Sequence, residues 1–355
     1  MVFRRYWWCG LAIAALLLIP SMPAFSAGAA EEAEPTPEAP IELVFVHQHI
    51  PFSISSGEVF KEYAERESDG AIQVTLLHWE ALGGDREVVE QLEVGDIHVT
   101  QATTGGLAGL WPDVQVYGWP FLFEDRYIAW KILDDEEHLS FMRDELLEAS
   151  GGTIRLFGGA ENAIRHLYTS RGPIRTPDDM EAARITMRTR AAPFDTTLWE
   201  ALGVVSTVDI PAAERYTAFQ TGMVHAAEGG PASNWEAGIM EVADYMTLTG
   251  HAFAHHFYII NEQFYQSLPA HLQRVIDGAM EEAITHQNRE AEVQNEEAVG
   301  IIRDAGNTVY EPTPEEIAQW RDRAMPVAEE FLGPALSSHV VEHVFDTLDR
   351  LRAER

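Results

Sequence analysis

From residue 41 onward, short strand-like segments alternate with longer helix-like segments, and this alternation constrains the fold more than any other feature. Residues 41–46 form a nearly continuous apolar run, and residues 72–76 alternate apolar and polar side chains. Between them, Ser55 and Glu58 have the spacing of a helix capping box, and apolar residues follow on one helical face. Strands that alternate with helices predict an α/β fold.

A second unit of the same kind occupies the middle of the chain. Its expected elements are a strand at 185–187, helices at 193–202 and 212–220, and a buried strand at 223–227. A much longer helical pattern follows Pro269 and runs to about residue 304 without a proline. At 1.5 Å per residue this helix would be about 50 Å long, so we expect it to brace two lobes.

The first residues have the pattern of an export signal. Two arginines precede an apolar run at 11–19, and small residues at 24–26 offer a cleavage site. This run is shorter than the roughly 20 residues that span a bilayer. We therefore expect a signal peptide at 1–26, a disordered leader at 27–40 and a periplasmic mature protein. Cys9 is the only cysteine, so the mature chain is expected to form no disulfide.

The charge of the chain excludes one class of partner. Its 24 basic and 57 acidic residues give a formal net charge of -33. Binding to nucleic acid depends on cationic side chains that displace counterions from phosphates. We therefore expect no nucleic-acid partner.

The strand ends of the first lobe carry polar and aromatic residues. Open α/β sheets bind ligands at such strand ends. The candidates presented there are His47, His49, His78, Trp79, Gln101, Thr103 and Thr104. Among them, His47, Trp79 and Thr103 are predicted to contact a ligand.

Several short motifs, in order, resemble one known family. They are Leu82-Gly83-Gly84-Asp85-Arg86-Glu87, Pro120-Phe121-Leu122-Phe123, Ile164-Arg165-His166, Thr176-Pro177-Asp178-Asp179, Met187-Arg188-Thr189, Ala201-Leu202-Gly203 and the run from Glu214 to Val224. Together they resemble the DctP family, the solute-binding proteins of tripartite ATP-independent periplasmic (TRAP) transporters, over nearly all of residues 41–310.

The resemblance implies a two-lobed α/β fold of the periplasmic-binding-protein type, with a long helix bracing both lobes. We expect lobe I to comprise residues 41–162 and 255–294, and lobe II to comprise residues 163–254 and 295–355. The implied function is capture of a small organic carboxylate by lobe closure, followed by delivery to a small DctQ-like and a large DctM-like membrane subunit. The protein is expected to be a monomer without a cofactor and without enzymatic activity.

The resemblance also assigns roles to two arginines. Arg188 takes the place of the family arginine that clamps the ligand carboxylate, since a guanidinium matches a carboxylate in bidentate geometry. Arg190 is a competing assignment, because residues two apart on a strand share a face. Arg165 matches a second arginine that helps to neutralise the ligand, with a surface or salt-bridged arginine as the alternative.

Two further residues are candidates in the second lobe. Glu228 stands where family members carry an acidic residue, and both ligand contact and a capping or hinge role are open for it. The next residues, Gly229 and Gly230, depart from the Asn or Trp of many members, which puts both a metal-assisted carboxylate site and a sugar-acid ligand in doubt. Phe194, with Trp79, is predicted to form an apolar wall for the ligand.

Two other functions are alternatives to that of a transporter component. His339, Glu342 and His343 match the H-x-x-E-H spacing of a zinc hydrolase. This motif lies in a helix whose buried stripe is Val340, Val344, Leu348 and Leu351, and few residues follow it to build a cleft. A stand-alone binding protein linked to a sensor is the third alternative.

Overall fold

The computed structural model describes residues 39–189, 193–211 and 214–355. In this part of the chain nine strands form one mixed sheet with the order β2-β1-β3-β8-β4-β7-β5-β6, and β9 pairs with β8. The strands are β1 (Ile41–His47), β2 (Ile72–His78), β3 (Val99–Ala102), β4 (Ile154–Thr169), β5 (Thr186–Thr189), β6 (Ser206–Asp209), β7 (Ala226–Gly229), β8 (Tyr245–Asn261) and β9 (Thr308–Tyr310). The predicted α/β class is confirmed.

Helices lie between nearly all of these strands. The α-helices are α1 (Pro51–Glu67), α2 (Asp85–Val94), α3 (Thr104–Leu107), α4 (Arg126–Asp134), α5 (Glu136–Ala149), α6 (Pro177–Ala182), α7 (Pro193–Ala201), α8 (Arg215–Gln220), α9 (Pro231–Glu236), α10 (Glu262–Ser267), α11 (Ala270–Asp304), α12 (Pro314–Ala335) and α13 (Ser338–Ala353). Short 3-10 helices are η1 (Trp79–Ala81), η2 (Pro112–Gly118) and η4 (Ile239–Glu241).

The long strands β4 and β8 join two halves of the sheet. They pair antiparallel from Ile154↔Asn261 to Thr169↔Tyr245, with register shifts along the ladder. β1, β2 and β3 run parallel to one another and join through β3 to the C-terminal part of β8. β5, β6 and β7 run parallel to one another and join through β7 to the C-terminal part of β4.

The register of these strands shows that both halves of the sheet have their carboxyl ends directed toward the middle of the β4–β8 ladder. β3 ends level with Phe257, and the chain beyond β3 continues toward Ala252 of β8, the partner of Arg165. β7 runs antiparallel to β4 and reaches His166, next to Arg165, at its own C-terminal end. The carboxyl ends of both sets of parallel strands therefore point toward the middle of the β4–β8 ladder.

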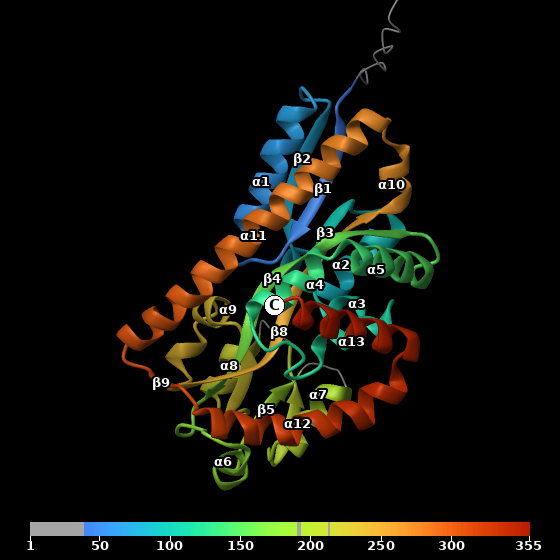
Figure 1. Ribbon diagram of the computed structural model, residues 1–355. Coiled ribbons are helices and arrows are strands. Elements are labelled where there is room, and N and C mark those ends of the chain that lie inside the picture. The colour runs from blue at the N-terminus through green and yellow to red at the C-terminus, as the bar shows by residue number, and fades with distance from the viewer. Residues whose placement is uncertain (1–38, 190–192, 212–213) are drawn as a thin grey trace, which may run out of the picture. The chain divides into compact units, whose positions relative to one another are not determined.

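The predicted long helix is α11, and its start after Pro269 and its end at Asp304 are confirmed. Figure 1 shows it passing α1 at one end and approaching β9 at the other. Its buried face is apolar near α1, for example at Ile276, but carries the buried polar residues Gln287 and Asn295 in its middle. These two side chains donate to the carbonyls of Glu161 and Asn162 in β4. The helix therefore binds the middle of the ladder through hydrogen bonds.

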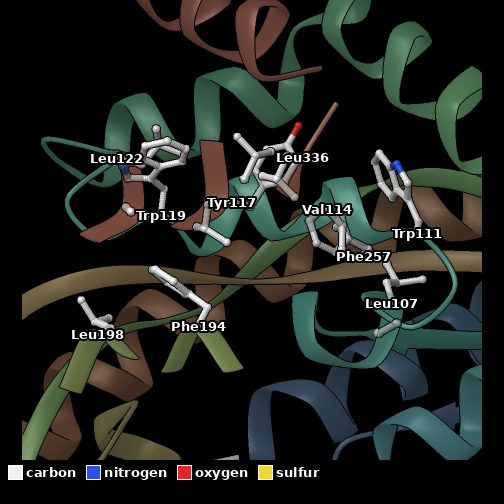
Figure 2. Close-up of a cluster of buried hydrophobic side chains, with 14 of the residues drawn as sticks. Leu107, Trp111, Val114, Tyr117, Trp119, Leu122, Phe194, Leu198, Phe257 and Leu336 are labelled. Atoms are coloured by element: carbon white, nitrogen blue, oxygen red, sulfur yellow. The ribbon is translucent and has the colours of Figure 1, made fainter. Parts of the chain in front are cut away.

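The largest hydrophobic cluster joins elements that are far apart in the sequence. Figure 2 shows η2 residues such as Tyr117 close to Phe257 of β8 and to Leu336, which follows α12. The C-terminal helix α13 adds its buried stripe at Val340, Val344, Leu348 and Leu351, as predicted. The burial of this face explains why the last helix docks on the fold.

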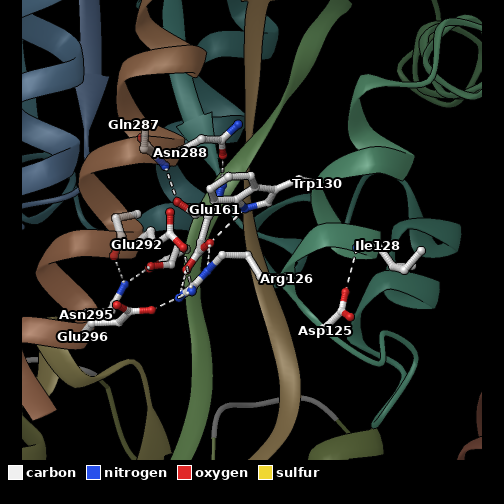
Figure 3. Close-up of polar contacts among 12 residues, drawn as sticks. Asp125, Arg126, Ile128, Trp130, Glu161, Gln287, Asn288, Glu292, Asn295 and Glu296 are labelled. Atoms are coloured by element: carbon white, nitrogen blue, oxygen red, sulfur yellow. Dashed lines mark hydrogen bonds and ion pairs between the residues drawn. The ribbon is translucent and has the colours of Figure 1, made fainter. Parts of the chain in front are cut away.

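A buried carboxylate connects α4, β4 and α11. Glu161 is fully buried, and Arg126 binds it through Nε at 2.8 Å and through a second nitrogen at 3.2 Å. The indole of Trp130 donates to the same carboxylate at 2.9 Å. Arg126 also reaches Glu292 and Glu296 on α11, at 3.1 and 2.9 Å (Figure 3). Burial raises the pKa of Glu161, and Arg126 opposes this shift.

Some predicted element boundaries are wrong. The first helix begins at Pro51 instead of after Ser55, and Ser56 lies buried inside it with its hydroxyl donating to the Ser53 carbonyl. The strand that was expected at 223–227 begins only at Ala226. Met223 lies before it and is 58% exposed, so it is not part of a buried strand. Residues 1–38, with Cys9 and the expected signal peptide, and the positions of Arg190 and 212–213 lie outside the described residues.

We expect Arg126→Met to lower the free energy of unfolding by about 3–5 kcal/mol, because Glu161 would remain buried without its cation. Arg66→Met is the matched control, since Arg66 is exposed and solvent screens its ion pairs. Urea titrations of both variants measure the difference. Equal losses in the two variants would show that the Glu161 pair is not a buried structural contact.

Four histidines have a pKa lowered to about 3, mainly by burial: His138, His166, His255 and His256. In the unfolded chain each binds a proton near its usual value of about 6.5, which the folded chain does not bind. The unfolded state therefore gains protons as the pH falls below about 6.5. Each such histidine lowers the free energy of unfolding by up to about 1.4 kcal/mol per pH unit in this range.

His255→Phe tests this pH dependence. The imidazole lies among the rings of Tyr117, Phe123, Phe253 and Phe257, so a phenyl ring suits the site. We expect the variant to be more stable than the parent at about pH 5.5, and to lose this advantage at about pH 7.5, in denaturant titrations. A difference that does not change with pH would contradict neutral burial of His255.

Candidate functional site

The predicted residues Arg165 and Glu228 meet at the middle of the β4–β8 ladder. Arg165 lies on β4, and Glu228 lies on the adjacent strand β7 opposite Leu167. The guanidinium of Arg165 donates to both oxygens of the Glu228 carboxylate. Burial disfavours the charge on Arg165, but Glu228 more than offsets this effect and raises its pKa. The salt-bridged alternative therefore describes Arg165 in this structure.

A histidine that the sequence analysis did not assign to the site joins this pair. The Nε2 atom of His251 on β8 lies 3.6 Å from the Glu228 carboxylate. Its Nδ1 atom shares a hydrogen bond of 2.7 Å with the Thr249 hydroxyl, and its ring packs edge-on against Trp199 of α7 at 5.3 Å. The sequence carried no signal for this role, because only the pairing of β8 with β4 brings His251 beside β7.

Arg188 lies on β5, one residue before its C-terminal end. Only 6% of its surface is exposed, and its Nε donates to the carbonyl of Ile210 at 2.7 Å. This bond fixes the orientation of the guanidinium plane at the carboxyl edge of the second half of the sheet. A charged group held in this way is suited to bind an anion.

Phe194 belongs to the same half. It lies in the first turn of α7 and is buried in the large hydrophobic cluster, with its ring 5.9 Å from that of Phe331 on α12 (Figure 2). This packing explains its burial within the fold. Its role as a ligand wall stays a prediction.

The candidates of the first half follow β1, β2 and β3. His47 is 1% exposed and contacts the Gln48 carbonyl through Nδ1 at 3.0 Å. Trp79 is buried with its ring 5.5 Å from that of His256 on β8. Thr103 caps α3 by accepting from the backbone of Gly105. All three occupy the predicted strand ends, and contact of any of them with a ligand stays a prediction.

The histidines of the H-x-x-E-H motif make other contacts in the structure. In the described ranges, no group of three or more His, Cys, Asp or Glu residues could hold a metal ion. His339 instead pairs with Glu145 at 2.9 Å, and His343 stacks on Phe141 at 3.8 Å. Among the residues that the structure places, no helix is long and apolar enough to cross a membrane.

A small open cavity lies beside the middle of β8. Its walls are Phe121, Leu122, Phe123, Glu124, Asp125, Ile164, Gly250, Ala252 and Phe253. None of the seven predicted site residues lines it. The cavity is therefore separate from the predicted ligand contacts.

Comparison with solved structures shows the class of protein to which this fold belongs. The sugar-acid-binding protein DctPAm of Advenella mimigardefordensis, solved in complex with galactonate, superimposes with a TM-score of 0.80 at 25% identity, covering 88% of this chain and 99% of that one. A TRAP periplasmic solute-binding protein of Ochrobactrum anthropi superimposes with a TM-score of 0.79 at 27% identity, covering 89% and 97%. The fold is therefore the two-lobed fold of TRAP solute-binding proteins.

The family follows from the sequence comparison. Residues 49–333 match the model of the DctP family, bacterial extracellular solute-binding protein family 7. The C4-dicarboxylate-binding periplasmic protein DctP of Rhodobacter capsulatus is 30% identical over 276 residues, covering 76% of this chain and 80% of that protein. The ectoine-binding periplasmic protein TeaA of Halomonas elongata is 25% identical over 279 residues, covering 78% and 79%. The chain belongs to the DctP family, and the comparisons give no support to a zinc hydrolase.

A double-mutant cycle tests the Arg165–Glu228 pair. We expect Arg165→Gln and Glu228→Gln each to destabilise the protein by about 3 kcal/mol or more, since each leaves a buried charge without its partner. The double variant should cost clearly less than the sum of the two single variants, because no charge is then left unpaired. Urea unfolding measures all three variants. Additive losses would contradict a direct buried pair.

Proposed function

We propose that the mature protein captures a small organic carboxylate between its two lobes and delivers it to the membrane subunits of a TRAP transporter. The observation that carries this proposal is the buried Arg188, whose guanidinium is fixed by Ile210 at the edge of the sheet. A bidentate contact from this group would hold the ligand carboxylate. Relatives that bind a C4-dicarboxylate and a sugar acid support an acidic ligand.

Closure of the lobes is the second part of the proposal. Lobe I would comprise 41–162 and 255–294, and lobe II 163–254 and 295–355. A register shift in the β4–β8 ladder between Glu161 and Ala163 lies next to one proposed boundary and supports a hinge there. A ligand that touches both lobes favours the closed state by its differential affinity, so capture needs no chemical step.

The remaining residues have supporting roles in this proposal. Arg165 would share its positive charge between Glu228 and the ligand when the lobes close. His47, Trp79, Thr103 and Phe194 would select the rest of the ligand. The partners would be a small DctQ-like and a large DctM-like subunit, and the protein would act in the periplasm as a monomer without enzymatic activity.

The proposal is tested by a thermal-shift screen of dicarboxylates, 2-oxoacids, hydroxyacids, sugar acids and ectoine-like zwitterions. A ligand present at about 100 times its Kd stabilises the folded state by about 2.7 kcal/mol and raises the midpoint. We expect Arg188→Ala to abolish the ligand-induced shift relative to its own unliganded midpoint, whereas Arg289→Ala, an exposed arginine on α11, should retain it. An unchanged shift in Arg188→Ala would remove Arg188 from the site.

A further inference from the structure

Three histidines at the ends of two neighbouring strands, or just beyond them, lie together at the carboxyl edge of the first half of the sheet. His47 ends β1 and His78 ends β2, and the parallel register pairs them directly. Their ring centroids are 4.9 Å apart. The ring of His49, just after β1, stacks on that of His78 at 4.4 Å. The three imidazoles therefore form a continuous contact.

This cluster extends from the core to the surface. His47 is buried, His78 is half-buried and His49 is exposed. Gly57 of α1 makes room for the innermost ring, because a Cβ atom there would lie 3.1 Å from the His47 ring. The Nδ1 atom of His78 is buried and has no hydrogen-bond partner among the described residues. The cluster thus contains a polar atom that the protein itself leaves unsatisfied.

The surroundings of His47 disfavour the protonated form of its ring before a ligand arrives. The titratable and charged groups that face His47 are His49, His78 of β2, Glu80 of η1 and His256 of β8. Burial lowers the pKa of His47, and the imidazoles of His78 and His49 lower it further, whereas the Gln48 carbonyl and Glu80 oppose the shift. Protonation of adjacent rings is unfavourable because like charges at this distance repel one another.

We propose that His47, His49 and His78 form a proton-linked subsite for a second acid group of the ligand. An anionic group placed against the rings offsets the repulsion and favours their protonated form, so the site takes up a proton as the anion binds. β1 and β2 run parallel to β3, whose carboxyl end is directed along β8 toward the middle of the β4–β8 ladder, so the cluster lies at the sheet edge that faces the second half. This inference rests on the proposed function, and it narrows the ligand to a dianionic organic acid.

The sign of the pH effect follows from this coupling. Because ligand binding raises the pKa of the cluster, affinity for a dianion increases as the pH falls. Uptake of one proton per ligand gives up to about a tenfold gain in affinity per pH unit. A ligand with one carboxylate, which places no anionic group against the histidines, should show no such dependence.

Calorimetric titration of the mature chain with succinate and with butyrate tests the proposal. Both probes have four carbons, but only succinate has a second carboxylate. Measurements at about pH 7.5 and about pH 6.5, in buffers of different ionisation enthalpy, count the protons taken up. We expect proton uptake and roughly tenfold tighter binding of succinate at the lower pH. His78→Gln should remove both effects, and His339→Gln, an exposed histidine on α13, should retain them.

The outcomes separate the two proposals. Succinate binding without proton uptake, or with the same uptake in His78→Gln, overturns the histidine subsite and leaves the proposed function intact. Binding of butyrate or galactonate without binding of succinate also overturns the histidine subsite and leaves the proposed function intact. If no carboxylate binds at either pH, the proposed function fails together with this inference. Circular dichroism of His78→Gln confirms that any loss is not caused by misfolding.

Discussion

The antiparallel ladder between β4 and β8 holds the two halves of the sheet together. It is the connection through which the sheet passes from one half to the other, and β4 also pairs with β7 next to Arg165. Register in a sheet with buried faces is strongly specified, since a slip of one residue would turn every side chain to the other face. The positions of Arg165, Glu228 and His251 are therefore consequences of two pairings of β4, with β7 and with β8.

Buried charge near this ladder is matched group by group. Glu161 is neutralised by Arg126, and Arg165 by Glu228. Such pairs contribute little net stability, because desolvation of both charges opposes their attraction. They do, however, penalise arrangements in which the partners separate. The ladder and the helix α11, which binds it through Gln287 and Asn295, are thus held in a defined geometry beside the proposed hinge.

The sequence predicted those features that depend on local chemistry. The α/β class, the long helix after Pro269 and the buried stripe of α13 followed from periodicity and terminal residues. The start of α1 at Pro51 was missed, because the hydroxyls of Ser55 and Ser56 resemble caps but bond to earlier carbonyls within the helix. A local spacing rule cannot distinguish these two uses of a serine.

Long-range pairing explains what the sequence could not predict. His251 joins Glu228, and His47 contacts His78, only because strands distant in sequence lie side by side. Family resemblance placed Arg165 and Arg188 in the site, but the pairing of Arg165 with Glu228 needed the register of β4 and β7. Composition and periodicity contain no information about such register.

A crystal structure of the mature protein with its carboxylate bound would show directly whether Arg188 holds the ligand. We predict a ligand between the two lobes, with its acid group in bidentate contact with the Arg188 guanidinium and the Ile210 contact retained. A bound molecule without negative charge, or an Arg188 side chain directed away from it, would contradict this prediction.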